Sequence, residues 1–297
     1  MSVLHPIVAV TGSSGAGTTS VKLAFEHIFE REGLIPAIIE GDSFHRYDRK
    51  EMEWEVEKAS LHGRTLTHFG VDGNLFDELQ ALFHDFGASG GGKRRYYIHT
   101  EEEGELHRGV PGTFTDWQPL PKNCDLLFYE GLHGALVTDQ IDIARLVDLL
   151  IGVVPIINLE WIQKIHRDRA VRGYSADAAT GMILRRMPDY VHFICPQFSR
   201  TDINFQRIPT IDTSNPFTAE DIPTNDESMV VIHIANRRKI NPDFPKLLEL
   251  LDGAFLSRRD TIVVPADKYA FAMELLLNPV IEKLMMNRDR ARANESA

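Results

Sequence analysis

The sequence PIVAVTGSSGAGTT, which spans residues 6–19, decides the fold of this chain. It opens with an apolar run suited to a buried strand, and the run ends in a turn that holds three glycines between Gly12 and Gly17. From Thr18 to about Arg31, apolar side chains recur at helical spacing. A strand, a glycine-rich turn and a helix in this order are typical of a phosphate-binding loop, in which backbone N–H groups and the helix dipole attract phosphate oxygens. The stretch therefore predicts a nucleotide site, with an ordinary glycine-rich turn as the alternative.

The loop departs from the usual phosphate-binding pattern at one position. Thr18 occupies the position that normally carries a lysine, whereas Thr19 holds the position whose hydroxyl normally binds Mg²⁺. The loop therefore offers amide dipoles but no cation, and we expect a positive side chain from elsewhere in the chain to replace the missing charge. We expect nucleotide contacts from all the loop residues, namely Gly12, Ser13, Ser14, Gly15, Ala16, Gly17, Thr18 and Thr19.

The rest of the chain continues the α/β pattern. A second strand at 37–40 follows the first helix and completes a β-α-β unit, which implies a parallel sheet with a right-handed crossover. Glycines between Gly87 and Gly92 predict a flexible loop. Further strands are predicted at 125–130, 149–154, 205–212, 229–234 and 261–264, and further helices at 158–172, 176–187 and 266–286. We predict one α/β domain over residues 1–286, with a mixed, mostly parallel sheet flanked by helices, and a disordered polar tail at 287–297.

Composition narrows the class of protein. The formal net charge of −11 argues against a nucleic-acid-binding protein, which usually carries a basic face. The two cysteines, Cys124 and Cys195, lie far apart and form no C-x-x-C pair, so no disulfide framework or zinc site is predicted. No run reaches 18 apolar residues and the N-terminus lacks a signal-peptide pattern, so we predict no membrane span and a cytoplasmic location.

Two carboxylates end predicted strands, where ligands bind in open α/β sheets. Asp42 follows the second strand and precedes the basic residues His45 and Arg46, so it could accept a proton from a substrate hydroxyl. Glu130 ends an apolar strand and could orient Mg²⁺ or its waters. The alternatives are an N-cap role for Asp42 and a helix-capping or surface role for Glu130.

Basic residues near these strand ends could bind an anionic ligand. His45 and Arg49 follow Asp42 closely, and their alternative is solvated surface charge. Tyr97 and His99 could line a polar sugar site or could simply alternate across a strand.

In the helix at 158–172, charges of alternating sign recur at i, i+4 spacing, which is also what a salt-bridged surface helix shows. That series consists of Glu160, Lys164, Asp168 and Arg172, and Arg167 and Arg169 flank it. The pair Arg185–Arg186 could close over a triphosphate, or could only complement a helix C-terminus.

Several long segments resemble bacterial phosphoribulokinase. They are VTGSSGAGTT, IEGDSFHR, FTDW, LLFYEGLHGA, IGVVPIINLEWIQKIHRDRAVRGY, ILRRM, QFSRTDINFQRIPTIDTSNPF and IVVP, and they run from Val10 to Pro265. The Thr18 variant of the loop is itself similar to this bacterial group. The resemblance implies a P-loop kinase fold and transfer of the γ-phosphoryl group of ATP to O1 of ribulose 5-phosphate, which gives ribulose 1,5-bisphosphate for carbon fixation.

The resemblance also implies roles for single residues, with Mg²⁺ as cofactor. Asp42 would be the catalytic base, and Glu130 and Asp168 would lie near the metal and the transferring phosphoryl group. Lys164 and Arg167 would supply the charge that the loop lacks, and Arg186 would contact the nucleotide. The contacts to the sugar phosphate would come from His45, Arg49 and Arg172, with Tyr97 and His99 nearby.

The family further implies a homo-oligomer, commonly an octamer, with NADH as allosteric activator. An arginine expected within the strand at 229–234 is His233 here, although Arg258 is present, and the loop lacks the cysteine that switches plastid forms. The alternatives are another small-molecule kinase of this fold, such as a uridine or pantothenate kinase, and a nucleotide-binding regulator without kinase activity. A GTPase is disfavoured because no N-K-x-D guanine-reading sequence occurs.

Overall fold

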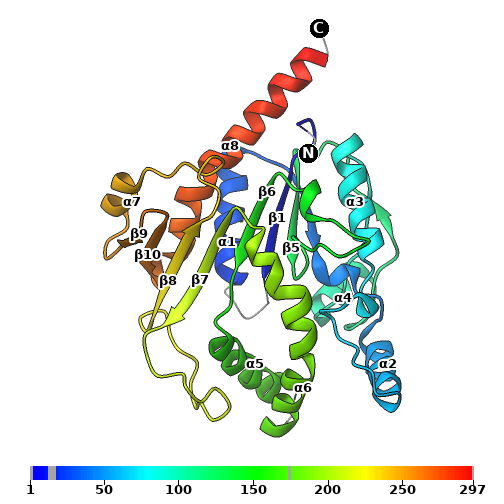
Figure 1. Cartoon of the computed structure of the whole chain (residues 1–297). Helices are drawn as coiled ribbons and strands as arrows, with labels where there is room; N and C mark the ends of the chain where they lie inside the picture. Colours follow the sequence, from blue (N-terminus) through cyan, green and yellow to red (C-terminus); the bar gives the residue numbers. More distant parts are fainter. Residues whose placement is uncertain (1–2, 13–17, 173–174, 296–297) are drawn as a thin grey trace.

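Strand β1 (Ile7–Gly12) lies inside an eight-stranded sheet with the order β2-β5-β1-β6-β7-β8-β10-β9 (Figure 1). The computed structural model describes residues 3–12, 18–172 and 175–295, without the side chains of residues 18–20, 22, 171 and 172. The strands on either side of β1 are parallel to it, and the sheet becomes antiparallel from β7 to β9. The other strands are β2 (Pro36–Glu40), β5 (Leu126–Gly131), β6 (Leu149–Val153), β7 (Ile203–Pro209), β8 (Ser228–Ile234), β9 (Phe255–Arg258) and β10 (Thr261–Pro265). The predicted mixed, mostly parallel sheet is confirmed.

Helices cover both faces of this sheet because β1 is apolar on both sides. Val8 and Val10 point into a core formed with α1 (Thr18–Glu32), α7 (Phe244–Leu250) and α8 (Tyr269–Glu295). Ile7 and Ala9 point into a second core formed with α3 (Phe76–Ser89). Alternate side chains of one strand therefore belong to two different cores, which is the pattern of a strand buried between two layers of helices.

The remaining elements lie around the carboxyl ends of the parallel strands. Helices α5 (Ile157–Arg172) and α6 (Ala176–Asp189) pack against each other through Ile165, Ala179 and Ile183. Figure 1 shows this helix pair and α2 (Arg49–Leu61) on the same side of the molecule, below the sheet. A two-stranded sheet, β3 (Lys93–Arg94) with β4 (Gln118–Pro119), and α4 (Glu101–His107) complete the fold. No helix in the described ranges is both long enough and apolar enough to cross a membrane.

The C-terminal helix corrects one prediction. Residues 287–297 were expected to be disordered, but α8 continues to Glu295, the last residue that the structure describes. The reason is a long-range contact: Arg288 is buried, and its Nη1 lies 2.6 Å from Oδ1 of Asp125. Arg292 adds a hydrogen bond to the carbonyl of Leu4. Polar residues here are therefore anchored by the body of the sheet.

The predicted flexible loop at 87–92 is also only partly correct. Helix α3 continues through Gly87 to Ser89 and ends at Gly90, which takes a left-handed φ of 71° that glycine tolerates well.

Candidate active site

The candidate site lies where β1, β2 and β5 end. Glu130 of β5 lies opposite Glu40 of β2 and Val10 of β1, so the carboxyl ends of these three strands are level with one another. Asp42 lies in a short 3₁₀ turn, Gly41–Phe44, that directly follows β2. The acid at the end of β2 and the acid at the end of β5 are thus brought to the same edge of the sheet, as predicted.

The phosphate-binding loop begins at the same edge. At Gly12, a Cβ atom would lie 2.4 Å from the carbonyl oxygen of Val153, so the close approach of β1 to β6 requires glycine here. Ser13, Ser14, Gly15, Ala16 and Gly17 lie outside the described residues. Thr18 and Thr19 form the start of α1, and only their backbone is described. The predicted order of strand, loop and helix is therefore confirmed, whereas the predicted contacts of the loop side chains stay predictions.

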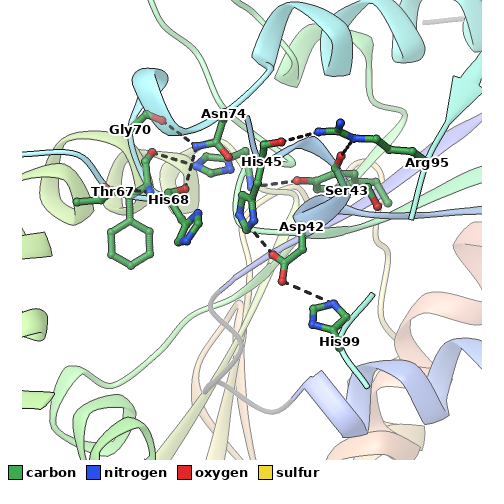
Figure 2. A network of polar contacts seen from close by, with 12 residues as sticks. Asp42, Ser43, His45, Thr67, His68, Gly70, Asn74, Arg95 and His99 are labelled. Atoms are coloured by element: carbon green, nitrogen blue, oxygen red, sulfur yellow. Dashed lines mark hydrogen bonds and ion pairs between the residues drawn. The ribbon is translucent and has the colours of Figure 1, made fainter. Parts of the chain in front are cut away.

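Asp42 faces two imidazoles. Its Oδ1 lies 3.6 Å from Nε2 of His45, and its Oδ2 lies 3.9 Å from Nε2 of His99 (Figure 2). The carboxylate is 43% exposed, so a ligand can reach it. The N-cap alternative does not hold for the following helix, because Asp48, not Asp42, caps α2.

The rings around Asp42 form a compact group, which we call the Asp42 cluster: Asp42, His45, Tyr97 and His99. The Tyr97 ring lies 4.8 Å from His99 and 6.3 Å from His45, centroid to centroid. Burial is the main cause that lowers the pKa of His45, and the negative charge of Asp42 opposes it. His45 is therefore neutral near pH 7. The cluster joins residues that lie more than fifty positions apart in sequence.

Helix α5 carries a second group, the Asp168 cluster, made of Lys164, Arg167 and Asp168. Nζ of Lys164 lies 2.5 Å from Oδ2 of Asp168, and Nε of Arg167 lies 4.0 Å from Oδ1. The Asp168 side chain is fully buried and that of Lys164 is only 15% exposed. The alternative of an exposed salt-bridged stripe is therefore wrong for this pair.

Charge effects place Arg186 near both clusters. Burial is the main cause that lowers the pKa of Lys164 and the charge of Arg186 lowers it further, whereas the hydrogen bond that Lys164 donates to Asp168 raises it. Arg186 also contributes to the lowered pKa of His45. The charge of Arg186 therefore acts on both clusters, and its contact with the nucleotide stays a prediction. Arg172 ends α5, and only its backbone is described.

Arg49 begins α2 beside the loop that carries Gly112. Its backbone N–H donates to the Gly112 carbonyl at 2.9 Å, and its side chain passes so close to Gly112 that a Cβ there would lie 2.9 Å from the Arg49 Cβ. Gly112 also has a left-handed φ of 92°. A residue with a side chain is therefore disfavoured both by this backbone conformation and by the close contact with Arg49.

Several residues near the site escaped the sequence analysis. Gln197 is almost fully buried, and its amide donates to the carbonyls of Leu132 and Phe193 while its oxygen accepts from the Ala135 N–H. This side chain fixes the segment that follows Glu130. Arg95 and the loop 67–75 hold the segment around His45. Of these residues, only Arg95 could have been found from the sequence, because it belongs to the basic run Lys93–Arg95.

His133 lies in the same segment, and burial lowers its pKa to about 3. Its Nε2 lies 3.0 Å from the Phe69 carbonyl, which fits a neutral ring that donates a proton there. In the unfolded chain the ring takes up a proton below about pH 6.5, but in the folded protein it does so only near pH 3. The stability that His133 contributes is therefore present above pH 6.5 and falls as the pH is lowered toward 3.

Replacing His133 with glutamine should flatten the acid side of the stability profile. The single ring is expected to account for a loss of about 1 kcal/mol of unfolding free energy between pH 7.5 and 5.5. Urea denaturation at both pH values would measure it, with His84→Gln as control because His84 is 71% exposed. An unchanged pH dependence in His133→Gln would contradict the assignment.

The site also fits a magnesium ion held by few protein ligands. Glu130 is half-buried at the end of β5, next to the start of the loop. Among the described residues no group of three His, Cys, Asp or Glu side chains could bind a metal. Mg²⁺ commonly takes one or two carboxylates and completes its shell with phosphates and water, so Glu130 is a suitable donor. Asp168 is engaged by Lys164, which makes it the weaker candidate for direct ligation.

Comparison with known proteins shows the family of this chain. Residues 7–214 match the model of the phosphoribulokinase / uridine kinase family. A phosphoribulokinase from Nitrobacter vulgaris is 58% identical and covers 97% of this chain and 99% of its own, and a plasmid-encoded phosphoribulokinase from Cupriavidus necator is 56% identical and covers 98% and 99%. The solved structure of the phosphoribulokinase from Rhodobacter spheroides is 50% identical, superposes with a TM-score of 0.89 and covers 97% of this chain and 100% of its own. The family resemblance inferred from the motifs is thereby confirmed, and the chain belongs to the phosphoribulokinase / uridine kinase family of P-loop kinases.

Proposed function

We propose that this chain transfers the γ-phosphoryl group of ATP to the O1 hydroxyl of D-ribulose 5-phosphate and releases ADP and D-ribulose 1,5-bisphosphate. The observation that carries the proposal is Asp42, which is accessible at the end of β2 and faces the His45 and His99 imidazoles. The near-full-length relatives named phosphoribulokinase favour this acceptor over uridine or pantothenate.

Asp42 acts as the general base. It accepts the O1 proton as O1 forms a bond to the γ-phosphorus, and the bond from that phosphorus to the bridging β–γ oxygen breaks, so that ADP leaves with the electron pair. His45 and His99 each face one carboxylate oxygen and keep the carboxylate oriented. Tyr97 packs against both rings and closes one side of the acceptor site.

The cations of α5 and α6 serve the nucleotide. The loop carries Thr18 in place of lysine, so Lys164, Arg167 and Arg186 balance the charge of the phosphates. Asp168 orients Lys164 through the 2.5 Å ion pair. Glu130 and the hydroxyl of Thr19 would hold Mg²⁺, which would supply positive charge against the phosphates.

A coupled ADP-release assay tests the choice of acceptor. Ribulose 5-phosphate, uridine and pantothenate are offered separately with ATP and Mg²⁺, and ADP is expected only with ribulose 5-phosphate. Release of ADP only with uridine or pantothenate would contradict the proposed substrate while leaving a kinase. No release of ADP with any acceptor would favour the alternative function, that of a nucleotide-binding regulator without kinase activity.

Arg49→Ala should raise the KM for ribulose 5-phosphate with a smaller effect on the KM for ATP. Arg49 starts α2 a few residues after Asp42 and suits a bidentate contact to the acceptor phosphate. Loss of one such contact, on the order of 1.5–3 kcal/mol, raises the KM by about 10- to 10²-fold. Lys50→Ala is the matched control, because Lys50 is the next residue and is exposed. A rise in the KM for ATP alone would place Arg49 on the nucleotide side. The same test applies to Arg172.

Some features expected from the family stay predictions. They are activation by NADH, assembly as an octamer and a cytoplasmic location. His233 pairs with Thr261 across the β8–β10 ladder, in place of the arginine expected in this strand.

A further inference from the structure

We propose that Arg95 is a positioning residue that holds the segment 42–45 in the geometry that catalysis needs. The inference rests on the proposed role of Asp42 as base. Arg95 itself touches main-chain atoms of this segment, and it acts on the reaction through Asp42 and His45.

The guanidinium of Arg95 bridges two carbonyls of the segment. Its Nε donates to the Ser43 carbonyl at 2.8 Å, and its Nη2 donates to the His45 carbonyl at 2.6 Å (Figure 2). The 3₁₀ turn that carries Asp42 is only four residues long, and the backbone bond at its end, His45 N–H to the Asp42 carbonyl, is 3.2 Å. Carbonyls at the end of such a turn lack partners within it, so Arg95 supplies the donors they need.

Arg95 is itself held in place by aromatic rings. Its Cζ lies 3.7 Å from the Phe114 ring centroid and 4.9 Å from the Trp117 ring centroid. Trp117 in turn meets the edge of Phe44, which is fully buried within the same turn. Burial lowers the pKa of Arg95, but the guanidinium stays charged at any working pH. A planar fork packed on aromatic rings is rigid, so it can fix the backbone that it binds.

The opposite edge of the segment is fixed by the loop 67–75. The N–H of Leu75 donates to the Phe44 carbonyl at 2.8 Å, and the N–H of Arg46 donates to the Gly73 carbonyl at 2.9 Å. Asn74 braces this loop through its amide, which donates to the carbonyls of His68 and Gly70. The carbonyls of Ser43 and His45 therefore accept from Arg95, whereas Phe44 and Arg46 bond to this loop. Removal of Arg95 takes away the hydrogen-bond donors on one edge of the segment.

A change in this backbone affects two side chains that it carries, those of Asp42 and His45. Nε2 of His45 lies 3.6 Å from Oδ1 of Asp42, and the His45 and His68 rings lie 4.1 Å apart, centroid to centroid, and are tilted by 35°. A shift of the backbone at residues 43–45 moves His45 and Asp42 relative to the acceptor. Misplacement of a base by about 1 Å can cost about 10²-fold in rate.

The test compares Arg95→Ala with Arg94→Ala. Arg94 is the matched control, because it also bonds a carbonyl, that of Ile38 at 3.2 Å, and also lies over an aromatic ring, Tyr96. Arg95→Ala is expected to lower kcat by about 10- to 10²-fold, with the KM for ATP unchanged. Guanidinium chloride at low millimolar concentration should restore part of that kcat, and Arg94→Ala should keep the wild-type kcat and show no rescue.

Arg95→Lys keeps the charge and the apolar stem but lacks the planar fork, so it separates positioning from charge. It is expected to fold, as judged by its melting temperature, and to lose kcat as Arg95→Ala does. A wild-type kcat in Arg95→Lys, or a kcat of Arg95→Ala equal to that of Arg94→Ala, would overturn the proposal. A rise in the KM for ribulose 5-phosphate with kcat unchanged would also overturn it, because a direct substrate contact behaves in that way.

Asp42→Asn distinguishes this failure from failure of the proposed function. If Asp42→Asn is inactive and Arg95→Ala is normal, only the role of Arg95 is wrong. If Asp42→Asn turns over normally, Asp42 is not the base, and Arg95 does not have the proposed positioning role either.

Discussion

Asp42→Asn is expected to lower kcat by at least ~10²-fold while ATP binding stays nearly intact. Asparagine has the shape of aspartate but cannot take up the hydroxyl proton. His45 is a poor substitute, because its side chain is only 10% exposed whereas that of Asp42 is 43% exposed. Steady-state kinetics would measure kcat, and calorimetric titration with ATP would measure binding.

The control for this substitution is Asp85→Asn, which makes the same chemical change on an exposed carboxylate of α3. It should leave kcat and ATP affinity unchanged. Turnover by Asp42→Asn near that of Asp85→Asn would exclude Asp42 as the base. A large loss of ATP affinity in Asp42→Asn would instead place this carboxylate on the nucleotide side.

Lys164→Met is expected to lower kcat by about 10²-fold, because it removes a cation that replaces the missing loop lysine. The structure adds a second expectation that sequence spacing alone does not: the variant should also be less stable. Asp168 is fully buried, and it forms a 2.5 Å ion pair with Lys164. Breaking a buried pair costs about 3 kcal/mol, at the low end of the usual range because Arg167 stays beside Asp168.

Lys58→Met provides the exposed counterpart. Lys58 pairs with Glu55 at 3.0 Å on α2, but its side chain is 63% exposed, so a loss of only a few tenths of a kcal/mol is expected. Melting temperature and kinetics measured on both variants separate the two roles of Lys164. A lower melting temperature with unchanged kinetics would reduce Lys164 to a structural partner of Asp168.

A second substitution in the Lys164→Met background tests the replacement of charge directly. Thr18→Lys returns a cation to the usual loop position, so part of the kcat should recover. Stability should not recover, because Asp168 still lacks its lysine. Recovery of stability without recovery of kcat would contradict the assigned role.

The sheet could be predicted from sequence where a strand shows a strong local pattern. β1 and β5 are runs of buried apolar residues, and the loop after β1 carries its own glycine signature. Strand β9 escaped notice because all four of its residues are exposed, so no alternation marks it. Helix α2 escaped for a similar reason, since only Met52 and Ala59 are buried.

In the site, too, contacts between residues close in sequence could be predicted, whereas contacts between distant residues could not. Asp42 and His45 are close in sequence, and their pairing was foreseen. The burial of Asp168 was not, because charges at i, i+4 look alike on an exposed and on a buried helix face. Arg95 reaches the carbonyl of Ser43 across 52 positions, and Arg288 reaches Asp125 across 163, which no local pattern encodes.

The position of β1 in the sheet has a consequence for biosynthesis. β1 precedes its neighbours β5 and β6 by more than a hundred residues along the chain, and the buried Ile7 N–H finds its partner Asp148 only 141 residues further on. Closing a loop of that length costs about 4 kcal/mol of chain entropy, which only the complete central sheet can offset. Until Leu126 and Leu149 have been synthesised, β1 lacks both of its neighbouring strands, so the edge of the sheet that carries the phosphate-binding loop can form only after them.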